Sequence, residues 1–143
     1  MSQDIIIVSK LLDAPKERVW KALTDRDEMK GWYFDLKAFK PEVGFEFEFY
    51  GGTPEKQYLH LCKIVEVVPG EKLAYSWRYD GYEGNSIVTF ELSEEGDKTK
   101  VTLTHTGVSS FPKDDPNFAV TSFTAGWTYI IETSLPQYLS SHN

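Results

Sequence analysis

Two spacings of hydrophobic residues divide this chain: short alternating runs upstream and one long helical stripe at the end. In residues 117–139, apolar side chains recur every three to four positions, with polar ones between them. This spacing is typical of an amphipathic helix. The stripe consists of Phe118, Phe123, Trp127, Ile130, Ile131, Leu135 and Tyr138. We therefore predict one long C-terminal helix, with a kinked or frayed last turn because Pro136 removes a backbone donor.

The upstream runs alternate with period two, as strands do. In the clearest run, Phe45, Phe47 and Phe49 alternate with Glu46 and Glu48, which predicts rings facing inward and carboxylates facing water. Other strands are expected at residues 4–12, 34–39, 58–68, 72–79, 86–93 and 98–106. The first of these is apolar on both faces in its first half, and residues 51–54 are expected to turn the chain. The pattern thus predicts about seven strands in a meander or partial barrel.

Two short amphipathic helices are expected between the first and second strands. The first covers residues 15–23 after Pro15, and the second runs to Trp32 with Asp25 or Asp27 as its cap. The last two strands should form a hairpin, with Val88, Phe90 and Leu92 facing Val101, Leu103 and His105. The chain, residues 1–143, is therefore predicted to be a single α+β domain, in which a curved antiparallel sheet wraps around the C-terminal helix.

Composition narrows the choice of partners. Aromatic residues make up 15% of the chain, which is more ring surface than a core of this size requires, so some rings are expected to line a cavity. The net charge of −7 argues against nucleic acid and anionic membranes as partners. Cys62 is the single cysteine and cannot form an internal disulfide, and no apolar run is long enough for membrane insertion. Without a signal-peptide pattern at the N-terminus, a cytoplasmic location is expected.

Several segments together resemble one known family. They are residues 13–25 (DAPKERVWKALTD), Gly31-Trp32, residues 64–73 (IVEVVPGEKL) with Trp77, residues 88–92 (VTFEL), residues 101–107 (VTLTHTG) and Gly126-Trp127. In this order they resemble the heat-shock protein 90 ATPase activator (AHSA)-like family, within the START-related SRPBCC superfamily of birch-pollen-allergen-like folds. The resemblance implies a helix-grip fold with a deep pocket for hydrophobic ligands between sheet and C-terminal helix. Pro136 and residues 109–116 depart from the family pattern.

The candidate ligand-binding residues are large side chains expected on the inner surface, some with a polar tip. They are Trp32, Phe47, Tyr58, His60, Tyr75, Trp77, Phe123 and Trp127. The alternative is that these rings are core residues packed against one another, as large aromatic side chains usually are. We expect Trp20 and Trp127 to be core residues first and ligand contacts second.

The histidines, one lysine and the cysteine have simpler structural interpretations. His60 and His105 could form a metal pair, but no further ligand spacing accompanies them; His105 is read as an interior histidine bonded to a carbonyl or a tyrosine. Lys10 is expected to be exposed instead of projecting into the pocket as a lone cation. Cys62 is read as a small hydrophobe. No catalytic constellation, no metal site and no cofactor is predicted.

Three functions follow as hypotheses. The first is non-enzymatic binding of a small hydrophobic or aromatic, lipid- or polyketide-like molecule. The second is a co-chaperone-like interaction module with a chaperone contact; the named activators carry a further N-terminal domain that these residues lack, which favours the first. The third is a polyketide cyclase-like enzyme using a tyrosine or histidine as acid or base. The sequence does not determine the oligomeric state.

Overall fold

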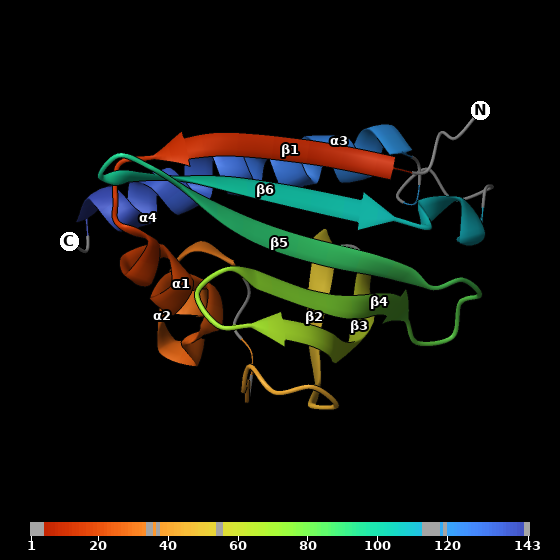
Figure 1. Cartoon of the computed structure of the whole chain (residues 1–143). Helices are drawn as coiled ribbons and strands as arrows, with labels where there is room; N and C mark the ends of the chain where they lie inside the picture. Colours follow the sequence, from red (N-terminus) through yellow and green to blue (C-terminus); the bar gives the residue numbers. More distant parts are fainter. Residues whose placement is uncertain are drawn as a thin grey trace.

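The fold is built on one antiparallel sheet of six strands in the order β1-β6-β5-β4-β3-β2 (Figure 1). A computed structural model describes residues 5–33, 36, 38–53, 56–112, 118 and 120–141. The strands are β1 (Ile5–Leu12), β2 (Glu46–Thr53), β3 (Lys56–Val68), β4 (Lys72–Tyr79), β5 (Ser86–Glu95) and β6 (Lys98–Thr106). Apart from β1, consecutive strands are neighbours, so most of the sheet is a simple meander.

Alternation along the strands determines which side chains face the core. Phe47 and Phe49 on β2 are buried, whereas Glu46 and Glu48 between them are exposed, as predicted. Phe45, just before β2, is only partly buried. On β4, the alternate residues Leu73, Tyr75, Trp77 and Tyr79 are all buried. The expected pairing of the last hairpin is also confirmed, since Val88 lies opposite His105, Phe90 opposite Leu103 and Leu92 opposite Val101.

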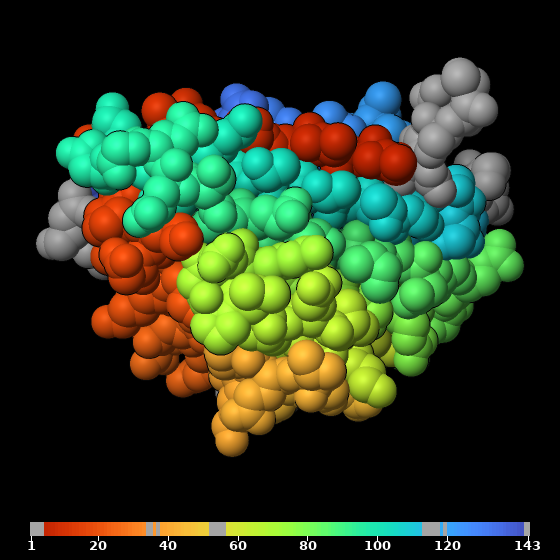
Figure 2. Space-filling view, viewed as in Figure 1, coloured from red at the N-terminus to blue at the C-terminus, as the bar shows by residue number. Residues whose placement is uncertain are grey.

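Three strand predictions are corrected. Leu36, Ala38 and Phe39 are not in a strand, and the other three residues of the expected strand at 34–39 lie outside the described residues, so the described part of the chain forms a sheet of six strands. Residues 51–53 belong to β2 instead of a turn, because they remain paired with β3. The first strand is not buried on both faces: Ile5 and Ile7 are 52% and 64% exposed, because none of the described elements covers the outer face of β1, which lies at the surface in the space-filling view (Figure 2).

Two helices connect β1 to β2 along the chain and lie at one end of the sheet (Figure 1). Helix α1 (Lys16–Thr24) buries Val19 and leaves Trp20 partly buried at the edge of the core. Helix α2 (Arg26–Trp32) begins at Asp25, whose carboxylate accepts the amide protons of Asp27 at 2.9 Å and Glu28 at 3.4 Å. Asp25 is therefore the cap, since its oxygen satisfies donors that the first turn leaves unpaired.

The C-terminal helix runs from residue 120 to residue 141 with a wider turn in the middle. Helix α3 (Val120–Tyr129) is followed by the π-helical turn η3 (Ile130–Ser134) and then by α4 (Leu135–Ser141). The amide of Leu135 donates to the carbonyl of Ile130, five residues back. The wider turn comes directly before Pro136, which cannot donate to a carbonyl of the preceding turn. The expected disturbance at Pro136 is thus a π turn, after which the helix continues to Ser141 instead of fraying.

The C-terminal helix lies against the inner face of the sheet and contacts β1 through α3 and η3 (Figure 1). Its inward stripe is buried: Phe123, Trp127, Ile131, Leu135, Tyr138 and Leu139. Ile130 of the predicted stripe is only partly buried, and Phe118, which was also predicted in it, is buried but precedes the helix. This arrangement confirms the predicted α+β helix-grip class. No helix within the described residues is both long and apolar enough to cross a membrane.

Candidate functional site

The candidate site is the aromatic layer between the sheet and α3. All eight sequence-predicted site residues are buried, and they come from α2, β2, β3, β4 and α3. Their rings belong to one connected network. Trp77 links the two sides of this network, since its ring centroid lies 5.3 Å from that of Trp127 and 4.9 Å from that of His60. Phe47 joins through Tyr75, at 5.1 Å between centroids.

Phe123 joins the same network through His105, at 5.2 Å between ring centroids, and Trp32 and Tyr58 join it through residues that were not predicted as site residues. Trp32 meets Phe90 edge-on at 6.5 Å, and Phe90 in turn meets Trp127 edge-on at 6.3 Å. Tyr58 meets Tyr79 at 5.7 Å between ring centroids. Edge-to-face contacts recur throughout, as is usual for well-packed aromatic rings. The described rings therefore contact one another, and whether they also contact a ligand stays a prediction.

Tyr33 occupies a central position that the sequence did not reveal. Its ring stacks on Trp127 at 6.3 Å with an interplanar angle of 18°, and it also contacts Phe49 and Phe90. Its hydroxyl lies 2.5 Å from the hydroxyl of Tyr75. Burial raises the pKa of both phenols well above the ordinary value, so both stay neutral at physiological pH.

His105 joins β6 to α3 through a buried chain of hydrogen bonds. Trp127 donates its indole N–H to Nδ1 of His105 at 2.9 Å. Nδ1 therefore carries no proton, and the imidazole proton is on Nε2, which lies 2.8 Å from Oγ of Ser86. Ser86 donates its own proton to the carbonyl of Trp77 at 2.9 Å. His105 is thus a satisfied interior histidine, as predicted, but its partners are Trp127 and Ser86 instead of a carbonyl or tyrosine.

This hydrogen-bond order matters because Ser86 and His105 have the spacing of a nucleophile and its base. A general base must accept the serine proton through an unprotonated ring nitrogen. Here the nitrogen that faces Ser86 is the donor, and the serine proton is directed at a carbonyl. Burial also lowers the pKa of His105 to about 3. The pair is therefore arranged for structural hydrogen bonding and not for proton abstraction from Ser86.

His60 and the other candidates are also accounted for by their surroundings. Nδ1 of His60 donates to the carbonyl of Tyr58 at 2.9 Å, and the ring stacks on Phe49 at 4.5 Å. Burial lowers the pKa of His60 to about 4. Among the described residues no group of three or more His, Cys, Asp or Glu side chains could hold a metal ion. Lys10 is exposed, as predicted, and the buried thiol of Cys62 has a raised pKa, which makes it unreactive.

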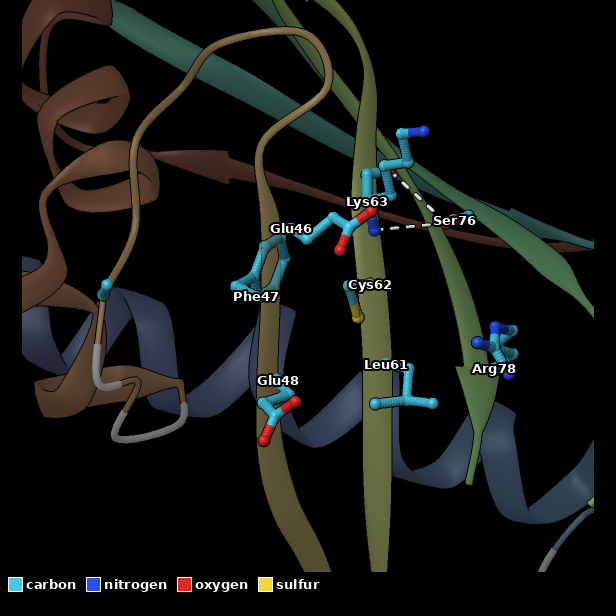
Figure 3. A pocket seen from close by; sticks show the side chains of 9 residues that line it. Glu46, Phe47, Glu48, Leu61, Cys62, Lys63, Ser76 and Arg78 are labelled. Carbon is cyan, nitrogen blue, oxygen red and sulfur yellow. Dashed lines mark hydrogen bonds between the residues drawn. The ribbon is translucent and has the colours of Figure 1, made fainter. Parts of the chain in front are cut away.

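A separate hollow of about 530 Å³ lies over β2, β3 and β4 (Figure 3). Its outward-facing lining includes Glu46, Glu48, Lys63, Ser76 and Arg78, and Figure 3 shows the bonds between the backbone of Lys63 and the hydroxyl of Ser76. These side chains alternate with the buried ones, so this hollow belongs to the outer face of the sheet. Of the eight predicted residues its lining includes Phe47 alone.

Tyr33, Tyr79, Ser86 and Phe90 are the site residues that sequence reasoning missed. Phe90 was expected on an inward face, and Tyr79 follows Tyr75 and Trp77 at strand spacing, so parity was the available signal for these two. Ser86 is the first residue of β5, and Tyr33 follows the last residue of α2. Positions at the ends of elements carry no periodicity, so no sequence signal points to them.

Comparison with solved structures supports the fold. CalU16 from Micromonospora echinospora is 27% identical, with a TM-score of 0.74 over 95% of this chain and 76% of that one. Mll3558 from Rhizobium loti is 19% identical, with a TM-score of 0.81 over 94% of this chain and 95% of that one. DynU16, from the dynemicin biosynthetic locus, is 22% identical with a TM-score of 0.79; the match covers 98% of this chain but only 48% of DynU16.

No curated protein matches this sequence significantly. A family model does match: that of the "Activator of Hsp90 ATPase homolog 1-like protein" covers residues 13–140. This range contains β2 to β6, the two short helices and the C-terminal helix except its last residue, and it begins directly after β1. Since the match extends over nearly the whole chain and the fold agrees with the resemblance seen in the sequence, the chain belongs to the Activator of Hsp90 ATPase homolog 1-like family.

Proposed function

We propose that this protein binds a small hydrophobic, aromatic or lipid-like molecule between the sheet and the C-terminal helix. The observation that carries this proposal is the convergence of eight buried aromatic and imidazole side chains from five elements on one layer. Ligand sites for small molecules are mostly apolar, with a few polar groups that orient the ligand. The Tyr33–Tyr75 hydroxyl pair is such a polar group inside the layer.

The proposal agrees with the electrostatics of the layer. His60, His105, Tyr33 and Tyr75 are neutral at physiological pH, because burial lowers the pKa of both interior histidines and raises that of the two tyrosines. A charged ligand would therefore lose its hydration without gaining an opposite charge. The origin of DynU16 in a biosynthetic locus is also in keeping with small-molecule binding.

Native mass spectrometry of freshly purified protein would test the proposal directly by showing whether a small molecule copurifies. In parallel, a panel of flavonoid-like, sterol and fatty-acid compounds should include at least one that raises the melting temperature, because a ligand that binds only the folded state stabilises it. That compound should shift the amide resonances of Trp32, Tyr75 and Trp127 together.

The matched control is Tyr129→Ala, since Tyr129 lies on α3 but is 62% exposed. This variant should bind the same compound with unchanged affinity. Shifts confined to Lys63, Ser76 and Arg78 would place binding in the outer hollow and contradict the proposal. So would the absence of binding by every compound together with a mass spectrum free of any copurified molecule.

A further inference from the structure

The ring of Tyr33 fills the middle of the aromatic layer, yet it belongs to neither the sheet nor the C-terminal helix. It follows the last residue of α2, and it inserts between Trp127 on α3 and the sheet residues Phe49 and Phe90. The residue as a whole is only partly buried, whereas its hydroxyl meets Tyr75, which is 1% exposed. Tyr33 therefore enters the core from the surface with its hydroxyl first.

The chain on both sides of Tyr33 is anchored by other bonds. Trp32 donates its indole N–H to the carbonyl of Ala22 at 2.9 Å and accepts at its own carbonyl from Ser134 at 2.8 Å. Beyond Tyr33, Arg26 donates to the carbonyl of Leu36 at 3.1 Å. The Tyr33 ring can therefore leave the layer by rotating about its own side-chain bonds while these backbone anchors remain in place.

Withdrawal of the Tyr33 ring would remove two interactions inside the layer. The face of Trp127 would lose its stacked partner, and the buried hydroxyl of Tyr75 would lose a hydrogen bond. An unpaired buried polar group is costly, whereas a guest that supplies the missing hydroxyl removes that cost. The best replacement is a flat aromatic ring that carries a hydroxyl group, which is the chemistry of the tyrosine side chain itself.

We propose that Tyr33 is an internal occupant of the ligand site, which a small hydroxylated aromatic ligand displaces before its hydroxyl bonds to Tyr75. This inference rests on the proposed function and adds to it the ligand class and the residue that competes with the ligand. If the site is open in only a fraction of the molecules, the apparent affinity for the ligand is the intrinsic affinity multiplied by that fraction. Tyr33 consequently lowers the affinity of the wild-type protein for every ligand of this layer.

The test compares 4-methylphenol, which has the ring and hydroxyl of tyrosine, with toluene, which lacks the hydroxyl. By calorimetry, Tyr33→Ala should bind 4-methylphenol at least about tenfold more tightly than the wild type does, because the internal competitor is gone. It should also prefer 4-methylphenol to toluene at least about tenfold, as one lost hydrogen bond implies. Adding Tyr75→Phe should abolish this preference but retain the binding of toluene.

Phe90→Ala is the matched control, because Phe90 also contacts Trp127 but its loss leaves Tyr33 in place. This variant should not show the hydroxyl preference. Tyr33→Phe keeps the ring in the layer and should bind 4-methylphenol no more than about threefold more tightly than the wild type. Equal affinities of the wild type and Tyr33→Ala, or equal hydroxyl preferences in Tyr33→Ala and Phe90→Ala, would overturn the inference.

A second measurement uses the wild-type chain and does not depend on the folding of a variant. In protein labelled with 3-fluorotyrosine, the fluorine resonance of Tyr33 should move toward a solvent-exposed value when a panel compound or 4-methylphenol binds. A compound that binds the layer without moving this resonance would contradict displacement but leave the proposed function standing. Binding of 4-methylphenol by Tyr33→Ala, with no binding of any compound by the wild type, would support internal occupancy and contradict the proposed function.

Discussion

The indole N–H of Trp127 donates to Nδ1 of His105 at 2.9 Å, and this bond joins the C-terminal helix to β6 in the middle of the core. It requires an imidazole that is unprotonated at Nδ1. The remaining ring proton goes to Ser86, so the tautomer of His105 is determined by its two neighbours. The helix, the sheet and the charge state of this histidine are therefore coupled.

The first prediction concerns the size and the hydrogen bond of Trp127. Trp127→Ala should lower the free energy of unfolding by about 3–5 kcal/mol, as for other large aromatic truncations. Trp127→Phe keeps a ring but leaves Nδ1 of His105 without its donor, which should cost about 1–3 kcal/mol. Denaturant melts measure both, with Tyr129→Ala on the exposed side of α3 as a control within about 0.5 kcal/mol. A loss below about 1 kcal/mol for Trp127→Ala would contradict the placement of the helix.

The second prediction is a loss of stability at mildly acid pH. The pKa values of His60 and His105 are lowered by burial from 6.5 to about 4 and about 3. Between these values and 6.5 the unfolded chain binds more protons than the folded one, so stability is fully present above pH 6.5 and falls as the pH is lowered. Each histidine should contribute a loss of about 1.4 kcal/mol between roughly pH 7.5 and 5.5.

Urea melts of the wild type, His60→Gln and His105→Gln over this pH range measure the effect. Each variant should lose about half of the pH dependence, because glutamine does not titrate, even if the variant is less stable at every pH. This range lies above the ordinary pKa values of aspartate and glutamate, so the carboxylates contribute little. An unchanged pH slope in both variants would show that the histidines are accessible to protons in the folded state.

The third prediction concerns Glu28, which holds α4 against the two short helices. One of its oxygens accepts from Arg18 at 2.6 Å and from the hydroxyl of Tyr138 at 3.0 Å. Because the Glu28 side chain is only 14% exposed, Glu28→Gln should cost about 1–2 kcal/mol. The control is Glu66→Gln, whose partner Lys72 lies 3.2 Å away in a pair that is 49% and 33% exposed, and which should change stability by less than about 0.5 kcal/mol. Equal losses in the two variants would contradict a role for Glu28 beyond that of a surface ion pair.

The fourth prediction compares two helical glycines. A Cβ at Gly31 would lie 2.6 Å from Cδ1 of Tyr138 and closer still to Cε1, so Gly31→Ala should push α2 and α4 apart at a cost of about 1–3 kcal/mol. A Cβ at Gly126 would have no atom within 4 Å, so Gly126→Ala should stabilise α3 by about 0.5–1 kcal/mol. Thermal melts of the two variants should therefore shift in opposite directions, and a shift in the same direction would contradict the contact between Gly31 and Tyr138.

Periodicity in the sequence determined the fold class and most inward faces. Alternation along a strand sends successive side chains to opposite faces, so Phe47 and Phe49 were expected inside and Glu46 outside from local geometry alone. The pairing of Val88 with His105 follows from the same parity, combined with a short turn. Strand alternation accounts for the five candidate site residues on β2, β3 and β4, and helical spacing for Phe123 and Trp127; all eight candidates are buried.

Only the tertiary structure decided which of these side chains touch and which faces are covered. The exposure of Ile7 depends on whether a second layer packs over β1, and nothing within β1 itself specifies that. The bonds of His105 and the insertion of Tyr33 join elements far apart in the chain, at distances set by sheet twist and by the rotation of the helix about its axis. Sequence spacing carries no information on either quantity. The sequence therefore predicted which aromatic side chains face inward, whereas the insertion of the Tyr33 ring among them was visible only in the folded chain.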